Sequence, residues 1–93
     1  MNLLTAEEID RKLRDLNEWR LTPDGIQKRF EMESFLSVMN LVNRVADLAE
    51  EANHHPEILI NYNKVTFTLT THDAGGVTEK DFDLAQRIEA IAP

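Results

Sequence analysis

The chain has no cysteine among its 93 residues, which excludes disulfides, thiolate metal ligands and a cysteine nucleophile. This absence fits a reducing compartment, and we expect a cytoplasmic protein. Basic residues are scarce, because 10 lysines and arginines stand against 17 aspartates and glutamates. The net charge of -7 therefore disfavours direct contact with nucleic acid or with an anionic membrane.

Long apolar runs are also missing. None approaches the roughly 20 residues that a membrane span needs, and the first ten residues lack the basic start and apolar core of a signal peptide. Repeats, linkers and low-complexity segments are absent as well. We therefore expect one soluble domain over residues 1–93, large enough to bury roughly 60–70% of its unfolded surface.

Apolar residues at helical spacing predict three helices. Thr5 and Glu8 form a capping box at the start of a first helix over about 6–16, which Asn17 can end in a left-handed conformation. A second helix is predicted over about 35–52, starting after Ser34. A third should follow the capping box of Thr78 and Asp81, with its apolar face formed by Phe82, Ala85, Ile88 and Ile91.

Alternating residues predict two hairpins between these helices. The turn residues 22–25 separate Trp19 and Leu21 from a strand that contains Ile26 and Phe30. After Pro56, a second hairpin is indicated by two alternating runs, Ile58, Ile60, Tyr62 and then Val65, Phe67, Leu69. The order α-β-β-α-β-β-α predicts an α+β two-layer sandwich, with three helices on one face of a four-stranded antiparallel sheet. The threonine-rich side of the last strand should face solvent or another subunit.

Two leucines of the second helix fall off its predicted apolar face. Leu41 and Leu48 are seven residues apart, whereas Phe35, Val38 and Val45 lie on the main stripe. They are either a subunit contact or two partly exposed leucines, and the sequence favours neither.

All three histidines fall within 19 residues, at positions 54, 55 and 72. Histidine has an unperturbed pKa near 6.5, so it can both give and accept a proton near neutral pH. His54 and His55 leave the end of the second helix, and His72 ends the last strand on the side opposite its core residues. A hairpin between them can bring these two ends close together. Each histidine taken singly is better explained as a helix cap or a surface residue.

A three-histidine metal site is the second chemical interpretation, because three protein ligands plus water is the pattern of catalytic zinc. Adjacent residues in extended chain point apart, however, which disfavours His54 and His55 as ligands of one ion. The usual pair of ligands four residues apart on a helix is also absent.

The spacing around these histidines resembles that of the pterin-4a-carbinolamine dehydratases. In that family a carboxylate is followed, after three intervening residues, by His-His-Pro or His-Asn-Pro. Five intervening residues separate this triplet from an aromatic, nine separate the aromatic from a histidine, and an aspartate follows. This chain has the matching residues Glu50, His54-His55-Pro56, Tyr62, His72 and Asp81. The resemblance covers nearly the whole chain, with a departure at Ile58, where family members often have an aromatic.

The resemblance implies dehydration of 4a-hydroxytetrahydrobiopterin to quinonoid dihydropterin and water by histidine acid-base catalysis. It implies no metal and no cofactor. It places His54, His55, His72 and Glu50 in the catalytic set. Pterin-binding groups would come from Pro56, Thr71, Asp73, Ala74 and Asp81. For Asp81 a role as helix cap is an equal alternative.

The same resemblance implies partners. Family members form dimers or tetramers, so we expect a homodimer or homotetramer with sheets joined edge to edge. An aromatic amino-acid hydroxylase that consumes the recycled pterin is implied in the same pathway. The alternative function is a non-enzymatic dimerisation cofactor that docks a helix onto a partner protein. Such an adaptor has no need of three histidines at this spacing.

Overall fold

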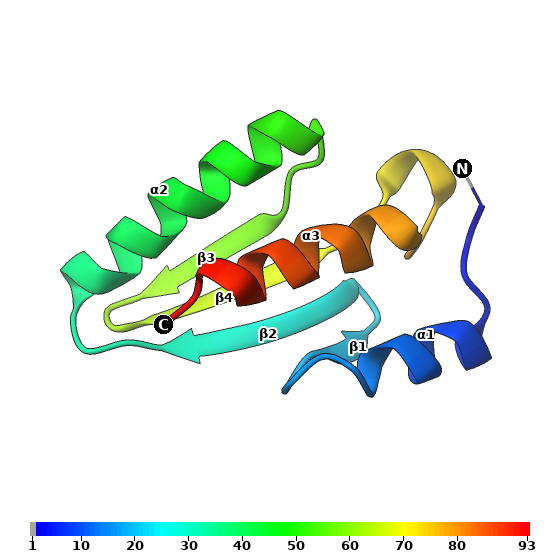
Figure 1. The fold of residues 1–93 in the computed structure, drawn as a ribbon, viewed down its shortest axis with the longest axis horizontal. Helices are drawn as coiled ribbons and strands as arrows, with labels where there is room; N and C mark the ends of the chain where they lie inside the picture. The colour runs from blue at the N-terminus through cyan, green and yellow to red at the C-terminus, as the bar shows by residue number, and fades with distance from the viewer. Residues whose placement is uncertain (1) are drawn as a thin grey trace.

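The computed structural model describes residues 2–93 and has the element order α-β-β-α-β-β-α (Figure 1). Four antiparallel strands form one sheet in the order β1-β2-β4-β3. Helices α2 and α3 lie over the sheet, roughly along its strands, and pack against each other, while α1 lies beside β1 (Figure 1). The predicted α+β sandwich is therefore confirmed. No helix within residues 2–93 is long and apolar enough to cross a membrane.

The helices are α1 (Ala6–Leu13), α2 (Phe35–Ala52) and α3 (Glu79–Ile91), with a short 3₁₀ helix, η1 (His72–Ala74), before α3. Both predicted capping boxes are confirmed. At α1, Thr5 Oγ1 accepts from the Glu8 amide at 3.1 Å, and Glu8 Oε1 accepts from the Thr5 amide at 2.9 Å. The matching pair at α3 is Thr78 and Asp81.

Helix α1 ends three residues earlier than predicted. The amides of Asp15 and Leu16 bond to carbonyls three residues back, so the chain tightens into a turn after Leu13. The left-handed residue is Glu18, at φ 66°, and not Asn17. This sharper exit buries both Leu16 and Trp19 in the core.

The strands are β1 (Arg20–Thr22), β2 (Gly25–Glu31), β3 (Glu57–Asn61) and β4 (Lys64–Leu69). Ile26 lies opposite Leu69 and Phe30 opposite Val65, so the apolar sides of β2 and β4 share the face that the helices cover. The prediction that Tyr62 continues the alternation of β3 is wrong. It is the first residue of a two-residue turn, at φ 53°, and its side chain is exposed.

The buried stripe of α2 consists of Val38, Leu41, Val45 and Ala49. Leu41 is only 3% exposed, which corrects its predicted place off the core face, and Leu48 is half-buried against the core. Phe35, predicted on the core face, is 50% exposed. The stripe is rotated because α2 packs against α3 as well as against β4.

The outer face of the sheet is more closely packed than predicted. Thr68 of β4 is buried, because Gln27 of β2 lies opposite it and donates to its hydroxyl at 2.9 Å. Thr66 is half-buried on the same face. The expectation that this side faces solvent or another subunit is therefore wrong at Thr68, which Gln27 covers, and stays a prediction for Thr66.

One ionic group lies within the core. Lys28 Nζ is 2.5 Å from Glu89 Oε1, and the same oxygen accepts from Trp19 Nε1 at 2.7 Å. The Lys28 side chain is 8% exposed, and its ammonium also lies 4.6 Å from the centre of the Phe30 ring. The Glu89 carboxylate on α3 therefore bonds both Lys28 of β2 and Trp19, the residue before β1.

Candidate active site

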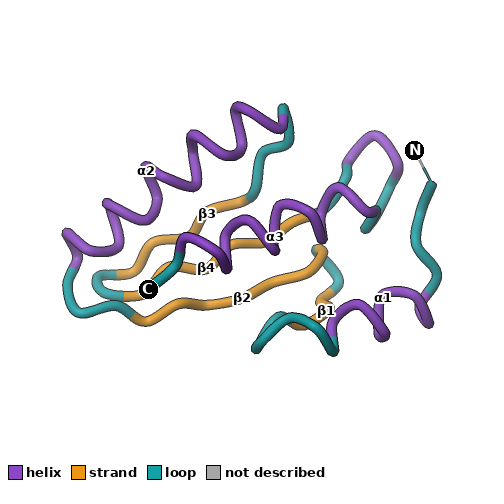
Figure 2. The backbone as a smooth tube through the Cα atoms, in the orientation of Figure 1, coloured by secondary structure: helices purple, strands orange, loops and turns teal. Residues whose placement is uncertain are grey.

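The β3–β4 hairpin brings the two histidine-bearing segments to one end of the sheet. Glu57 lies opposite Thr68 in the antiparallel register, so the residues before β3 and those after β4 leave the sheet at the same end (Figure 2). Tyr62 lies at the opposite end of this hairpin. The aromatic of the sequence pattern is therefore a turn residue remote from the histidines.

The end of α2 fixes the direction of the first segment. Asn53 adopts the left-handed conformation at φ 50°, and the His54 amide donates to the Ala49 carbonyl at 3.0 Å. This closes the helix with hydrogen bonds to its last carbonyls. Pro56 then favours an extended conformation at His55, and β3 begins at Glu57. His54 is thus held by the helix end on one side and by a strand on the other.

His54 is hydrogen-bonded to Asp81, the third residue of α3. The distance from His54 Nε2 to Asp81 Oδ1 is 2.6 Å, and the side chains are 11% and 0% exposed. The other oxygen, Asp81 Oδ2, accepts from the Thr71 hydroxyl and from the Thr78 amide, both at 2.9 Å. Asp81 is therefore the helix cap and the partner of His54 at once, so the two interpretations of this residue are compatible.

His55 has a carboxylate partner of its own. Its Nε2 is hydrogen-bonded to Glu50 Oε2, one turn back on α2. Both side chains are mostly exposed, at 58% and 76%. The two adjacent histidines therefore differ in environment, since His54 is held in a buried network and His55 in a solvated pair.

His72 is exposed and begins η1, three positions after the last residue of β4, Leu69, so it lies beyond the strand that it was predicted to end. Among residues 2–93 its ring has no hydrogen-bond partner within the protein. Its neighbour Thr71 is 4% exposed and anchors this turn, because its carbonyl accepts from the amides of Ala74, Gly75 and Gly76. Through Thr71 and Asp81, the His72 turn is joined to His54.

The remaining residues expected at the site also lie at this end of the sheet. Asp73 is exposed, while Pro56 and Ala74 are half-buried. The Thr71 hydroxyl points at Asp81 and is not free to meet a ligand. Sequence reasoning placed Thr78 only as a helix cap, although its Oγ1 lies 2.8 Å from Thr71 Oγ1 and so belongs to the same network. The sequence did contain a signal for Thr78, because its capping-box partner Asp81 is also the last residue of the histidine pattern.

Metal-binding geometry does not arise at this site. Across the described part of the chain, no three histidine, aspartate or glutamate side chains converge as a ligand set for an ion. The two closest pairs each combine one histidine with one carboxylate, which is the arrangement that orients an imidazole.

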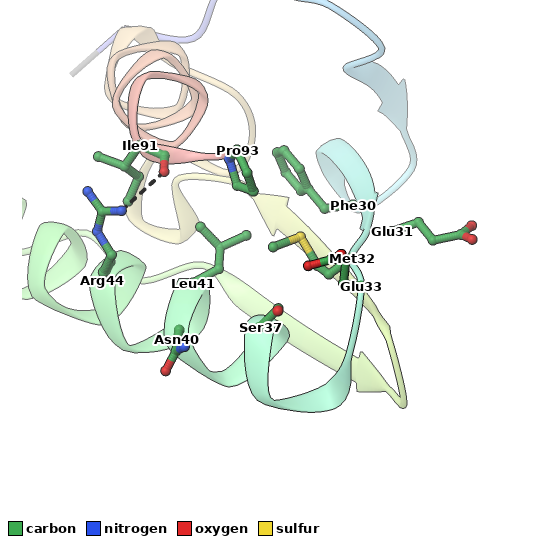
Figure 3. Close-up of a pocket in the computed structure, with 10 residues that line it drawn as sticks. All are labelled: Phe30, Glu31, Met32, Glu33, Ser37, Asn40, Leu41, Arg44, Ile91 and Pro93. Carbon is green, nitrogen blue, oxygen red and sulfur yellow. Dashed lines mark hydrogen bonds between the residues drawn. The ribbon is translucent and has the colours of Figure 1, made fainter.

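A separate hollow of about 650 Å³ lies away from the histidines (Figure 3). Phe30, Met32, Leu41 and Pro93 point toward it, and Arg44 donates to the Ile91 carbonyl at 3.4 Å across one side. It contains no histidine and no paired acid and base. The candidate site is therefore assigned by its chemistry and not by the size of a cavity.

Two imidazoles, each with a carboxylate on Nε2, and a third that is free provide several groups for proton transfer. The fold and this site define a small α+β protein with paired histidines and carboxylates at one end of its sheet, an arrangement that can perform acid-base chemistry. The family model described as pterin 4 alpha carbinolamine dehydratase matches residues 2–91, and the chain belongs to this family.

Relatives of the chain match over almost their full length. A protein of Picosynechococcus is 51% identical over 95% of this chain and 96% of its own, and one of Acidobacterium capsulatum is 48% identical over 98% and 99%. Both are provisionally named pterin-4-alpha-carbinolamine dehydratase.

Two solved structures share the fold. One is a transcriptional coactivator/pterin dehydratase from Brucella melitensis, which is 36% identical with a TM-score of 0.94 and covers 99% of this chain and 100% of its own. The other is a pterin dehydratase-like protein identified as a RuBisCO assembly factor in the alpha-carboxysome, which is 28% identical with a TM-score of 0.69 over 82% of this chain and 90% of its own. Proteins that share this fold are therefore named both as a dehydratase and as an assembly factor.

Proposed function

We propose that this protein dehydrates 4a-hydroxytetrahydrobiopterin to quinonoid dihydropterin and water, and so recycles the cofactor of aromatic amino-acid hydroxylases. The observation that carries the proposal is the hydrogen-bonded pair of His54 and Asp81 beside the His72 turn, in a chain of this family. Histidines oriented by carboxylates suit a reaction that needs both an acid and a base near neutral pH.

The reaction removes one proton and one hydroxide from neighbouring atoms of the pterin ring. A protonated imidazole gives its proton to the hydroxyl on carbon 4a, which leaves as water. A neutral imidazole takes the proton from nitrogen 5, and the electron pair of that bond forms the double bond between nitrogen 5 and carbon 4a. The balance needs no oxidant, reductant or metal. Each well-placed group typically contributes about 10²–10⁴ in rate.

The positions of the side chains indicate which histidine can approach the ligand and which ones a carboxylate orients. His72 is exposed and free, so it can approach a ligand from the turn after β4. His54 and His55 come from the end of α2, where Asp81 and Glu50 orient them. The segments with Pro56, Asp73 and Ala74 would hold the flat ring through main-chain groups, since they lie at this same end of the sheet.

The test is the rate of dehydration of 4a-hydroxytetrahydropterin, followed by ultraviolet absorbance. The native protein should accelerate the reaction, with and without a chelator, and His72→Ala should reduce the rate at least tenfold. Tyr62→Ala is the matched control, because this exposed aromatic lies at the opposite end of the β3–β4 hairpin and should leave the rate unchanged. A native protein that gives no acceleration would overturn the proposal.

We also propose a homodimer joined through the edge strand β3. In residues 2–93 this strand pairs with β4 on one side only, so its other edge is open to another copy. Sedimentation velocity at micromolar concentration should give a dimer, or a tetramer made of two dimers. A monomer at that concentration would contradict this assignment.

A protein-docking role is the second candidate function. It is favoured by Phe35 and Leu36, which expose 50% and 68% of their surfaces at the start of α2, and by the assembly role named for one structural relative. The triple change of His54, His55 and His72 to Gln separates the two functions, because a docking module keeps its partner after this change and an enzyme loses its activity.

A further inference from the structure

Asp81 is the meeting point of a buried chain of hydroxyl groups that ends on His54. Thr78 Oγ1 lies 2.8 Å from Thr71 Oγ1, which donates to Asp81 Oδ2 at 2.9 Å. Asp81 Oδ1 lies 2.6 Å from His54 Nε2. The three residues that lead to His54 are at most 4% exposed, so water does not compete for these bonds.

The directions of these hydrogen bonds follow from the number of protons available. An ionised carboxylate only accepts, and the N-terminus of α3 favours a negative charge at this position. Thr71 gives its single proton to Asp81, so the short contact between the hydroxyls is a donation from Thr78 to Thr71. The Thr78 amide provides the second donor to Asp81 Oδ2. Every proton in the chain therefore points toward Asp81.

We propose that Thr71 and Thr78 are positioning residues that fix the proton of neutral His54 on Nε2. With Asp81 Oδ2 occupied by two donors, Oδ1 is the oxygen turned to the imidazole, and it must receive a proton from Nε2. The neutral ring is then held as one tautomer, with its lone pair on Nδ1. This inference rests on the proposed dehydratase function for its catalytic meaning, but not for its structural content.

Nδ1 of His54 is the nitrogen left to react. No hydrogen-bond partner meets it within residues 2–93, yet no buried side-chain nitrogen or oxygen in this part of the chain lacks a partner. Nδ1 is therefore in contact with solvent even though the His54 side chain is only 11% exposed. In the dehydration, the proton that His54 exchanges with the pterin passes through Nδ1, while Nε2 stays bonded to Asp81.

The test uses Thr71→Val, which removes the hydroxyl and keeps the volume of the side chain. Nitrogen-15 NMR of the imidazoles at about pH 8, where histidine is neutral, should show His54 in the native protein with its proton on Nε2. In Thr71→Val, Asp81 Oδ2 loses one of its two donors, so the carboxylate can turn and release Nε2, and the two tautomers of His54 should mix. The value of kcat should fall roughly 10- to 100-fold with KM changed less than about twofold, as expected for one lost hydrogen bond to a charged group.

Two further variants separate positioning from general damage to the fold. Thr71→Ser keeps the hydroxyl and should restore both the tautomer and kcat. Thr68→Val is the matched control, because Thr68, in β4, is also buried and also hydrogen-bonded, but its partner is Gln27 on the outer face of the sheet. It should leave the His54 signals unchanged.

A native His54 protonated on Nδ1, or a Thr71→Val protein with an unchanged tautomer, would overturn the inference. These outcomes do not depend on activity. If the native protein fails to dehydrate the pterin while the tautomer responds to Thr71→Val, the proposed function fails and the positioning role stands.

Discussion

His54 and Asp81 are 27 positions apart in the chain and share a hydrogen bond of 2.6 Å between Nε2 and Oδ1. This bond joins the end of α2 to the start of α3, the two helices that cover the sheet. The carboxylate that caps one helix thus orients the histidine that follows the other. The same side chain therefore caps α3, links it to the end of α2 and fixes part of the site's geometry.

Replacing Asp81 by Asn should reduce dehydration by about 100-fold or more, because the amide can present a donor to His54 and favour the wrong tautomer. The amide oxygen can still cap α3, so the fold should persist, as circular dichroism would show. The control is Asp83→Asn on the same helix, where the carboxylate is exposed. Equal rates for the two variants would remove Asp81 from the mechanism.

The buried ion pair of Lys28 and Glu89 should respond unequally to loss of either partner. Glu89→Ala leaves the Lys28 ammonium, with a side chain 8% exposed, without its carboxylate, and also removes the acceptor of Trp19. We expect a loss of about 2–3 kcal/mol in the free energy of unfolding, below the full cost of a broken buried pair because Glu89 is 27% exposed.

Lys28→Met should cost less than about 1 kcal/mol, since the apolar stem stays packed and the partly exposed Glu89 keeps Trp19 as a donor. Urea unfolding of both variants measures the difference. A Lys28→Met protein as unstable as Glu89→Ala would show that the charge pair itself, and not the unpaired ammonium, decides the result.

Two glycines should differ in their tolerance of a methyl group. At Gly25, with φ 137°, an added Cβ would lie 2.1 Å from the Leu69 carbonyl oxygen, whereas at Gly75, with φ 81°, nothing lies within 4 Å. We expect Gly25→Ala to lower the free energy of unfolding by about 3 kcal/mol or more and Gly75→Ala by about 1–2 kcal/mol. Thermal unfolding measures both. The assignment of the β1–β2 turn would be contradicted if Gly25→Ala were the milder change.

The capping box of α1 should make stability depend on pH. Hydrogen bonds from the Thr5 backbone, and then from its side chain, lower the pKa of Glu8 below its usual value of 4.5. A carboxyl whose pKa is lower in the folded state stabilises the protein above the unfolded pKa, and this contribution is lost as the pH falls through the folded one.

Glu8→Gln therefore should lower the urea midpoint at pH 7 and leave it nearly equal to that of the native protein well below pH 4.5, where Glu8 is protonated as well. A difference between the two proteins that stays constant across this range would show that the Glu8 charge plays no part.

Local signals in the sequence predicted most of the fold. The capping boxes at Thr5 and Thr78, and the end of α2 at Ala52, depend on residues within one helical turn and were predicted correctly. Hairpin pairing followed from alternation in the same way. The errors concern contacts between elements that are far apart in the sequence. The buried stripe of α2 includes Leu41 because α3 lies beside α2, and no pattern within α2 alone reveals that neighbour.

The same distinction between local patterns and long-range contacts applies to the site. The histidine pattern and the antiparallel hairpin were enough to expect residues 54–56 and 71–74 at one end of the sheet. The sequence could not show that the Thr71 hydroxyl points inward to Asp81, or that Thr78 extends the network, because these contacts depend on how the η1 turn meets α3. Nor could it show that Asp81 both caps α3 and holds His54.

The central claim is that the three histidines carry the dehydration. Its most direct test is the dehydration rate of 4a-hydroxytetrahydropterin with the native protein and with the triple variant His54→Gln, His55→Gln and His72→Gln, after circular dichroism has shown that the variant is folded. We predict that the native protein accelerates the reaction and that the triple variant returns it to the uncatalysed rate. A folded triple variant as fast as the native protein would contradict the account.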